Sequence, residues 1–182
     1  EINQLTPIYG GIAPERIDNL HGLQWPCLNA EHPGTKYLHQ GKFARGLGHF
    51  SPAEHQEPAE LPDVDYPLTL TTGRVYWHYH TGSMTRRTNL LDRECPDNFV
   101  EVHPKTAKEL NIRNGETVTV ETRRGAIELK TKVTEEIIPG LIFVPFHFSE
   151  AGANVLTNPA HDPVGKIPEY KVCAARIKRK VV

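Results

Sequence analysis

The chain has 182 residues, a formal net charge of −1 and 38% hydrophobic residues, which suits one domain of ordinary size plus a connector. No apolar run is long enough to span a bilayer and no charged-then-apolar start resembles a signal peptide, so a cytoplasmic protein is favoured and a periplasmic one left open. Residues 1–68 carry 4 Lys and Arg against 9 Asp and Glu, whereas residues 69–182 carry 17 against 13. An anionic ligand is therefore expected on the second part, which is not basic enough to indicate nucleic acid.

Residues 1–66 are predicted to form an irregular connector. Residues 1–49 are rich in Gly, Pro and His without sustained periodicity, and one short helix is expected near residues 14–19. The segment Phe50–Pro67, FSPAEHQEPAELPDVDYP, holds four prolines and five acidic residues but no Lys or Arg. Such a composition favours an extended path, so this segment is predicted to be a linker or a strap across a surface.

From residue 67 onwards, apolar residues alternate over short stretches, as in strands that bury one face. Turns are predicted at residues 114–115, 124–125 and 139–140, and Pro104 is expected to open a short helix. The predicted strands come from YPLTLTTGR, FVEVHP, ETVTVETRRGAIELKTKV, LIFVPF and KVCAARIK. Many short strands with close turns predict a mainly β fold with short helices, closed or nearly closed into a barrel.

Two strands of this barrel have a predicted inner face. Ile127, Leu129 and Val133 fall on one side of the return strand of the hairpin, and Cys173, Ala175 and Ile177 fall on one side of the last strand. The three cysteines, Cys27, Cys95 and Cys173, are odd in number and far apart, which suits neither a disulfide framework nor a zinc site. Each is therefore interpreted as a small buried hydrophobe in a reducing compartment.

The stretch Thr71–Arg87, TTGRVYWHYHTGSMTRR, has the most unusual composition. Its three aromatic residues, Tyr76, Trp77 and Tyr79, are not expected to face bare solvent, and its Arg and His side chains are not expected in a core strand. The stretch therefore indicates a partner that needs flat rings, hydrogen-bond donors and positive charge together.

A zinc site is the first alternative for this stretch. His78 and His80 stand two apart and would project to one face of a strand, as zinc ligands sometimes do. No Cys, Asp or Glu lies nearby to complete a tetrahedral set, and His147 would have to come from another strand. The simpler alternative is that both imidazoles hydrogen-bond to a ligand or to the backbone.

The segment FVEVHPKTAKELNIRNGETVTVETRRGAIELKTKVTEEIIPGLIFVPFHF resembles the double-psi β-barrel that ends the large subunits of molybdopterin-dependent oxidoreductases. The flanking motifs GLQWPC, HPGT, YHTGSMTRR, NVLTN and KIPEYKVCAARI are similar to the C-terminal, molybdopterin-dinucleotide-binding part of a formate dehydrogenase catalytic (alpha) subunit. The barrel identifies only the superfamily. The ordered flanking motifs, which extend the resemblance over nearly the whole chain, point to formate dehydrogenase over nitrate reductase.

This resemblance implies that residues 67–182 cap a bis-(molybdopterin guanine dinucleotide) cofactor that holds molybdenum or tungsten. It implies oxidation of formate to carbon dioxide with release of two electrons, with no catalytic residue and no metal ligand from this chain. The Cys or selenocysteine on the metal and the iron–sulfur clusters would belong to upstream domains of the same subunit. Those domains are the implied partners, together with electron-transfer subunits, and the chain alone is expected to be inactive, without nucleic-acid or membrane contact.

When the family's cofactor-binding positions are matched to this sequence one by one, the resemblance implies twelve cofactor-binding residues. Arg is expected to give two-pronged donors to pterin carbonyls or phosphate, Gly to allow close backbone approach, and Ser and Thr to add short hydroxyl donors. The residues are Arg74, His78, Tyr79, His80, Thr81, Gly82, Ser83, Met84, Thr85, His147, Asn154 and Lys166.

Several of these and neighbouring residues have a purely structural alternative. Tyr76 and Trp77 would pack the barrel mouth, Met84 would fill a gap, and Asn154 would cap a turn. Arg86 and Arg87 would form a solvated pair or bind a carboxylate of the acidic segment. The basic end RIKRK would be a solvated tail.

Two other functions compete with formate dehydrogenase. One is another superfamily member such as nitrate reductase, since substrate choice is set mainly upstream. The other is a non-enzymatic double-psi barrel that binds peptide or another ligand without a cofactor. The density of imidazole and guanidinium groups in Arg74–Arg87 argues against a peptide-binding barrel.

Overall fold

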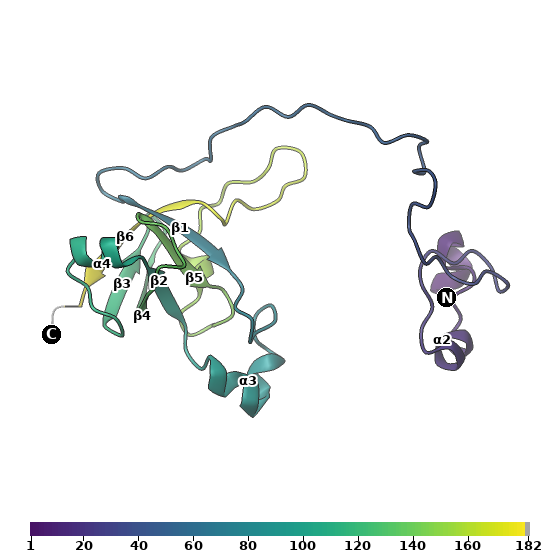
Figure 1. Cartoon of the computed structure of the whole chain (residues 1–182), viewed down its shortest axis with the longest axis horizontal. Coiled ribbons are helices and arrows are strands. Elements are labelled where there is room, and N and C mark those ends of the chain that lie inside the picture. The colour runs from purple at the N-terminus through teal and green to yellow at the C-terminus, as the bar shows by residue number, and fades with distance from the viewer. Residues whose placement is uncertain (181–182) are drawn as a thin grey trace. The chain divides into compact units, whose positions relative to one another are not determined.

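The computed structural model describes residues 1–180, which divide after His55 into two units. Figure 1 shows the chain with its elements labelled; each unit is described by itself. None of the helices in residues 1–180 has the length and apolar character that crossing a bilayer requires.

The first unit, residues 1–55, consists of short helices and loops ordered around one arginine. Its helices are α1 (Ile2–Leu5), η1 (Pro7–Tyr9) and α2 (Pro14–Leu20), so the short helix predicted near residues 14–19 is confirmed. The Arg16 guanidinium of α2 donates to Gly11 O at 2.5 Å and to His32 O at 2.9 Å. These bonds satisfy backbone carbonyls that no helix or strand would satisfy.

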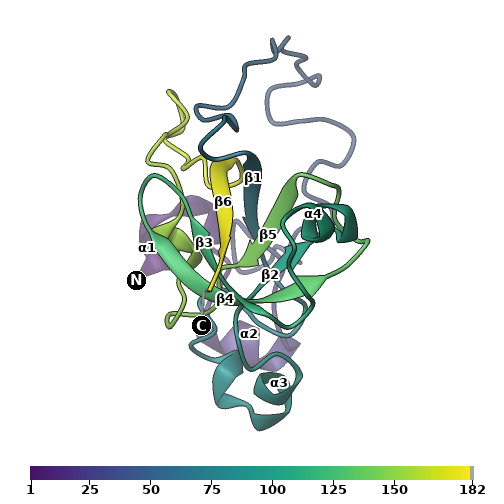
Figure 2. The same ribbon diagram turned by 90° about the vertical axis from the view of Figure 1, so that its left-hand side faces the viewer.

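The second unit is a closed barrel of six strands in the order β1-β5-β2-β4-β3-β6 (Figure 2), which confirms the predicted mainly β barrel fold. Strand β1 runs parallel to β5, and β2 runs parallel to β4, while the other four pairings are antiparallel. The strands are β1 (Leu68–Gly73), β2 (Phe99–Val102), β3 (Thr117–Glu121), β4 (Ala126–Val133), β5 (Leu141–Pro145) and β6 (Cys173–Arg179).

Four short helical elements connect these strands. They are η2 (Thr85–Arg87), α3 (Asn89–Glu94), α4 (Pro104–Glu109) and η3 (Ala153–Val155). Helix α4 was predicted from Pro104, and His103 caps it, because the Nδ1 atom of His103 accepts from Lys105 N–H at 3.0 Å. Helix α3 was not predicted.

The core lies inside the barrel and is built from alternating residues of all six strands. On β4, Leu129 points inward as predicted, but Thr131 is buried beside it. The Thr131 hydroxyl donates to Arg113 O at 2.6 Å, which satisfies this polar atom inside the core. The inner face of β4 therefore includes a polar residue between its apolar ones.

The prediction of a solvated basic tail was wrong, because this part of the chain is strand β6. Arg176 and Lys178 both pair with Glu121 of β3, at 2.7 and 2.5 Å. Arg179 pairs with Glu116 at 2.8 Å. The basic residues therefore face carboxylates on neighbouring segments, and residues 181–182 lie outside the described part.

Part of the acidic segment forms a strap across the outside of the barrel (Figure 1). Glu60 pairs with Arg123 and Arg124, and Tyr66 lies between two guanidinium groups, 4.6 Å from Arg123 and 4.8 Å from Arg176. Stacked Arg–Tyr contacts of this kind add attraction beyond the ion pairs. We call residues 56–66 the strap.

Candidate functional site

The segment with the unusual composition is a loop, not a strand. It leaves the end of β1 at Gly73 and leads through η2 to α3. Its aromatic residues are exposed, with Tyr76 92% and Tyr79 53% exposed, so the expectation that they avoid solvent was wrong for this chain. An exposed group of large rings indicates a binding surface.

His147, two residues after the end of β5, holds this loop at its start and near its middle. Its ring is 1% exposed; Nε2 accepts from Val75 N–H at 2.9 Å, and Nδ1 donates to the His80 carbonyl. Nδ1 therefore carries the proton, and burial lowers the pKa of His147. The resemblance assigned His147 to the cofactor, and in the structure both of its ring nitrogens bind protein backbone.

His78 is held in the opposite tautomer. Its Nε2 atom lies 2.7 Å from the Cys95 carbonyl, which can only accept, so Nε2 carries the proton. Nδ1 then accepts from the Thr85 hydroxyl at 3.1 Å, and that hydroxyl accepts from Tyr79 N–H at 3.2 Å. His78 and Thr85 are therefore occupied inside the protein and shape the loop from below.

The two buried histidines leave a different set of donors on the surface. The Arg74 guanidinium lies 5.8 Å from the Tyr79 ring and 6.0 Å from the Phe146 ring, and the His80 ring meets the Tyr79 ring edge-on at 4.3 Å. Within residues 1–180, neither Arg74 nor His80 has a side-chain hydrogen-bond partner. We call Arg74, Tyr79 and His80 the donor surface.

The remaining predicted residues of the loop divide in the same way. The side chains of Thr81, Ser83 and Met84 are exposed, so Met84 does not fill a gap. Gly82 is buried at a φ of +72°, where an added Cβ would lie 2.8 Å from Arg86 and 3.0 Å from His147 O. Gly82 therefore serves the packing of the loop itself.

The two arginines at the end of the loop have different environments. Arg86 donates to both oxygens of Glu150 at 2.9 Å and to Asp92 at 3.4 Å, and lies 5.0 Å from the Phe148 ring. It binds carboxylates, as one interpretation held, but they do not come from the acidic segment. In the part of the chain that the structure describes, the Arg87 side chain has no carboxylate partner.

Asn154 and Lys166 lie away from the donor surface. Asn154 is exposed in η3, and Lys166 is exposed on the loop 159–172 at a φ of +56°. Both views show the loop 159–172 leaving the barrel on the side opposite α3 (Figures 1 and 2). No contact between these two residues and the donor surface is present among residues 1–180, and the Asn154 side chain caps no turn there.

Sequence reasoning missed the polar contacts where β1 meets the chain before β6. The Thr72 hydroxyl donates to Tyr170 O at 2.9 Å, and Lys171 Nζ donates to Thr72 O at 2.5 Å. Of the motif KIPEYK, only Lys166 is among the predicted cofactor-binding residues. The sequence signal for these contacts is the pair of threonines that precedes Gly73 in β1.

An open cleft of about 700 Å³ lies beside the donor surface. Arg74 lines it with Tyr76, Trp77, Phe99 and Phe143. The Trp77 ring is 38% exposed and meets Tyr76 edge-on at 5.1 Å. Aromatic rings and a cation thus continue from the donor surface into this cleft.

The geometry does not support zinc at this loop, because His78 points inward with both nitrogens occupied and His80 points outward. Across residues 1–180, no three His, Cys, Asp or Glu side chains are arranged to hold a metal ion. The three cysteines are free and buried, as predicted. Burial raises the pKa of both Cys95 and Cys173.

Curated relatives cover nearly the whole chain. It is 52% identical over 181 residues to the F420-dependent formate dehydrogenase subunit alpha of Methanocaldococcus jannaschii, covering 98% of this chain and 27% of that protein. It is 41% identical over 174 residues to the assimilatory nitrate reductase catalytic subunit of Bacillus subtilis, covering 93% of this chain and 24% of that protein. The chain thus spans about a quarter of the length of these relatives.

A solved structure has the same fold. Acetylene hydratase from Pelobacter acetylenicus superimposes with a TM-score of 0.63 at 24% identity, over 69% of this chain and 21% of that one. The family described as the Molydopterin dinucleotide binding domain matches residues 68–174, which run from the first residue of β1 into β6. The chain therefore belongs to the molybdopterin dinucleotide-binding domain family.

Proposed function

We propose that residues 67–182 bind a molybdopterin guanine dinucleotide through the donor surface, within a larger molybdenum- or tungsten-dependent formate dehydrogenase. Residues 1–66 act as the connector to the other domains of that subunit. The observation that carries this proposal is the pair of unpartnered donors, Arg74 and His80, held at fixed positions by the buried His147. A pterin is flat, edged with acceptors and followed by a pyrophosphate, so it suits exposed rings beside cationic donors.

The residues of the loop take two roles in this proposal. Arg74, Tyr79, His80, Thr81, Ser83 and Met84 are exposed and would contact the cofactor directly. His78, Gly82, Thr85 and His147 hold the loop that presents them. Asn154 and Lys166 would reach another part of the two-dinucleotide cofactor from the segment 154–172.

The cofactor supplies the metal at which formate is oxidised to carbon dioxide. This chain would bind and orient the dinucleotide and would exclude water from the face it covers. The metal's protein ligand and the iron–sulfur clusters are assigned to the upstream domains, so the chain alone is expected to turn over no formate with a dye acceptor. Reproducible turnover by the isolated chain would contradict this assignment.

Formate dehydrogenase is favoured over nitrate reductase because identity to the Methanocaldococcus formate dehydrogenase is 52%, against 41% for the Bacillus nitrate reductase. Formate-dependent reduction of F420 by the complete enzyme would support the first activity. Nitrate-dependent oxidation of a reduced dye, without formate turnover, would support the second.

The binding role is tested with Arg74→Ala and His80→Ala in the complete subunit. Both variants are expected to lose bound pterin, measured by fluorescence of the oxidised pterin released from a known amount of protein. Arg113→Ala is the matched control, because the Arg113 side chain is exposed and makes no hydrogen bond or close ion pair among residues 1–180. Normal pterin content in both test variants, with unchanged circular dichroism, would contradict cofactor binding through the donor surface, whereas a complete subunit that contains no pterin at all would favour a binding module without cofactor.

A further inference from the structure

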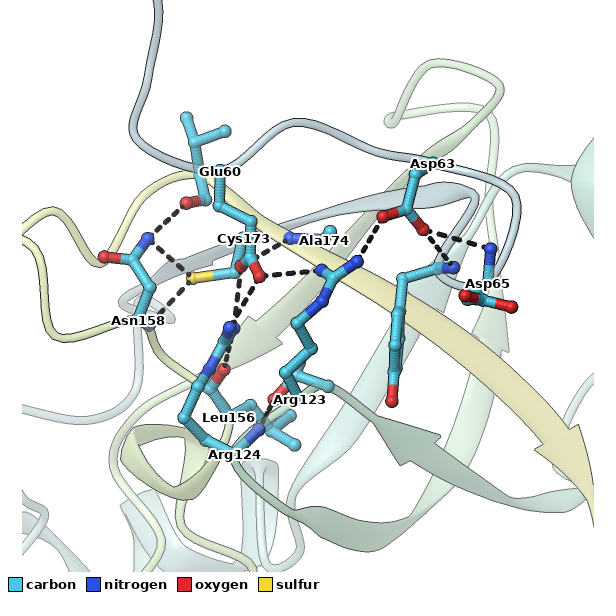
Figure 3. Close-up of polar contacts among 12 residues, drawn as sticks. Glu60, Asp63, Asp65, Arg123, Arg124, Leu156, Asn158, Cys173 and Ala174 are labelled. Carbon is cyan, nitrogen blue, oxygen red and sulfur yellow. Dashed lines mark hydrogen bonds and ion pairs between the residues drawn. The ribbon is translucent and has the colours of Figure 1, made fainter.

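The Glu60 carboxylate lies at the centre of a hydrogen-bond network between the strap and the barrel (Figure 3). It accepts from both terminal nitrogens of Arg124, at 2.6 and 2.8 Å, from Arg123 at 2.9 Å and from Ala174 N–H at 3.0 Å. Burial by itself would raise the pKa of Glu60, but the hydrogen bonds from Arg124, Ala174 and Arg123 outweigh it and lower that pKa. The carboxylate therefore stays charged and fixed.

Arg124 carries this contact to the next segment of the chain. Its Nη2 atom, which donates to Glu60, also donates to the Leu156 carbonyl at 2.9 Å. At the adjacent residues, one after Arg124 and one before Leu156, Gly125 packs so closely on Val155 that an added Cβ would lie 2.6 Å from Val155 Cγ1. The turn between β3 and β4 thus holds the turn at residues 153–156 at two neighbouring points.

Two residues beyond Leu156, the Asn158 side chain closes the base of the loop 159–172. Its amide nitrogen donates to Val172 O at 2.8 Å and to Glu169 O at 3.1 Å, and its amide oxygen accepts from Ala160 N–H at 2.9 Å. The strap reaches the same loop, because Ala59 N–H donates to the Glu169 carboxylate at 3.0 Å.

These contacts matter because the segment 154–172 has little regular structure of its own. Between η3 and β6 its one strand-type pairing is the isolated bridge His161–Pro168, among the residues that the structure describes. A segment without ladder hydrogen bonds opens at a low cost in free energy unless side chains fix it. Its position relative to the barrel therefore depends on side-chain contacts, namely those of Arg124, Asn158 and the strap together with the bonds of Tyr170 and Lys171 to Thr72.

We infer that the Glu60–Arg124 pair is a positioning device for the segment 154–172, and that it sets how firmly this segment holds the cofactor. The inference rests on the proposed function, which assigns Asn154 and Lys166 to cofactor contact. Neither Glu60 nor Arg124 is among the residues that the proposed function assigns to cofactor contact. Glu60 holds the Arg124 guanidinium in place, and this guanidinium in turn donates a hydrogen bond to the Leu156 carbonyl.

The first test is Glu60→Gln in the complete, cofactor-loaded subunit. The substitution keeps the size of the side chain but removes the charge that holds Arg124 in its bidentate geometry. Hydrogen exchange is measured by mass spectrometry on peptides from residues 154–172 and from β3 and β4. Exchange is expected to rise about tenfold or more in residues 154–172, with β3 and β4 unchanged. Pterin is expected to dissociate faster by a similar factor.

A second variant keeps the test informative if Glu60→Gln fails to fold. Arg124→Lys keeps the positive charge, but an ammonium group cannot replace the planar fork that binds Glu60 and Leu156 together. It is expected to reproduce both effects of Glu60→Gln. Cys173 gives a further measurement: it is 0% exposed beneath the strap, and its alkylation should become faster in both variants. The matched control is Glu128→Gln, which removes an exposed pair with Lys180 at 2.9 Å.

The inference is overturned if both variants leave exchange of residues 154–172 unchanged. It is also overturned if exchange rises while the pterin dissociation rate stays at the parent value, because the segment would then not hold the cofactor. Failure of the proposed function appears elsewhere, as normal pterin content in Arg74→Ala and His80→Ala, whose residues lie outside the segment 154–172.

Discussion

His147 offers the most direct test of how the site is built. Replacing it with Leu keeps a buried side chain of similar size but leaves Val75 N–H and the His80 carbonyl without their partner. A neutral hydrogen bond contributes about 0.5–1.5 kcal/mol, so the loss of two is expected to lower the free energy of unfolding by about 1–3 kcal/mol. The upper end applies where the two backbone groups cannot reach water.

Two further variants separate the two hydrogen bonds. The Asn amide nitrogen stands near the position of Nδ1, so His147→Asn should keep the bond to the His80 carbonyl. The Gln side chain places its amide near Nε2, so His147→Gln should keep the bond from Val75 N–H. Each is expected to lose about half as much stability as His147→Leu, measured by urea denaturation followed by circular dichroism.

The pH dependence supplies an independent check. Because burial lowers the pKa of His147 below its ordinary value of 6.5, the folded chain disfavours the protonated ring. The unfolded chain therefore binds the proton first, and stability that is complete above pH 6.5 is lost as the pH falls from 6.5 through the folded pKa. This loss should be absent in His147→Gln. The tethering role is refuted if His147→Leu is as stable as the parent within about 0.5 kcal/mol.

Three other substitutions test the packing and charges of the barrel by urea denaturation. Gly125→Ala is expected to cost about 1–3 kcal/mol through overlap with Val155, and adding Val155→Ala should recover most of it; no recovery would contradict the close approach. Thr131→Val should cost about 1–2 kcal/mol because its buried hydroxyl donates to the Arg113 carbonyl at 2.6 Å. Hydrogen bonds, from Arg176 first, lower the pKa of Glu121 from 4.5 to about 2. The stability that Glu121 adds is therefore complete above pH 4.5 and lost toward pH 2, and Glu121→Gln should flatten this acid decline.

The strands of the barrel could be predicted from sequence because their patterns are local. Leu129 in β4, and Cys173, Ala175 and Ile177 in β6, face inward as their spacing indicated. Which strand pairs with which could not be predicted from these local patterns, because the pairings join residues far apart in the chain. For the same reason the basic end was taken for a tail: only the register of β6 against β3 places its cations beside Glu121.

The candidate site shows the same limit. Composition singled out the loop after β1 as the candidate site, but it did not indicate which residues of the loop face inward. His78 and His80 are equivalent in the sequence pattern, yet His78 bonds a carbonyl 17 residues away while His80 faces outward. His147 was assigned to a ligand because its partners, 72 and 67 residues away, are backbone groups that no side-chain pattern reveals.

The order of strands also governs when this domain can fold during synthesis. Strand β1 has β5 and β6 as neighbours, so the strand of the barrel that is synthesised first cannot pair until the last two have been synthesised. Only β3 and β4 pair with a strand next to them in the chain. Pairing between distant segments is slow because the entropy of closing the loop is lost before the stabilising contacts form. A nascent chain that ends before Cys173 exposes one open edge on β1 and another on β3, and such edges favour aggregation. The barrel closes only once β6 has left the ribosome.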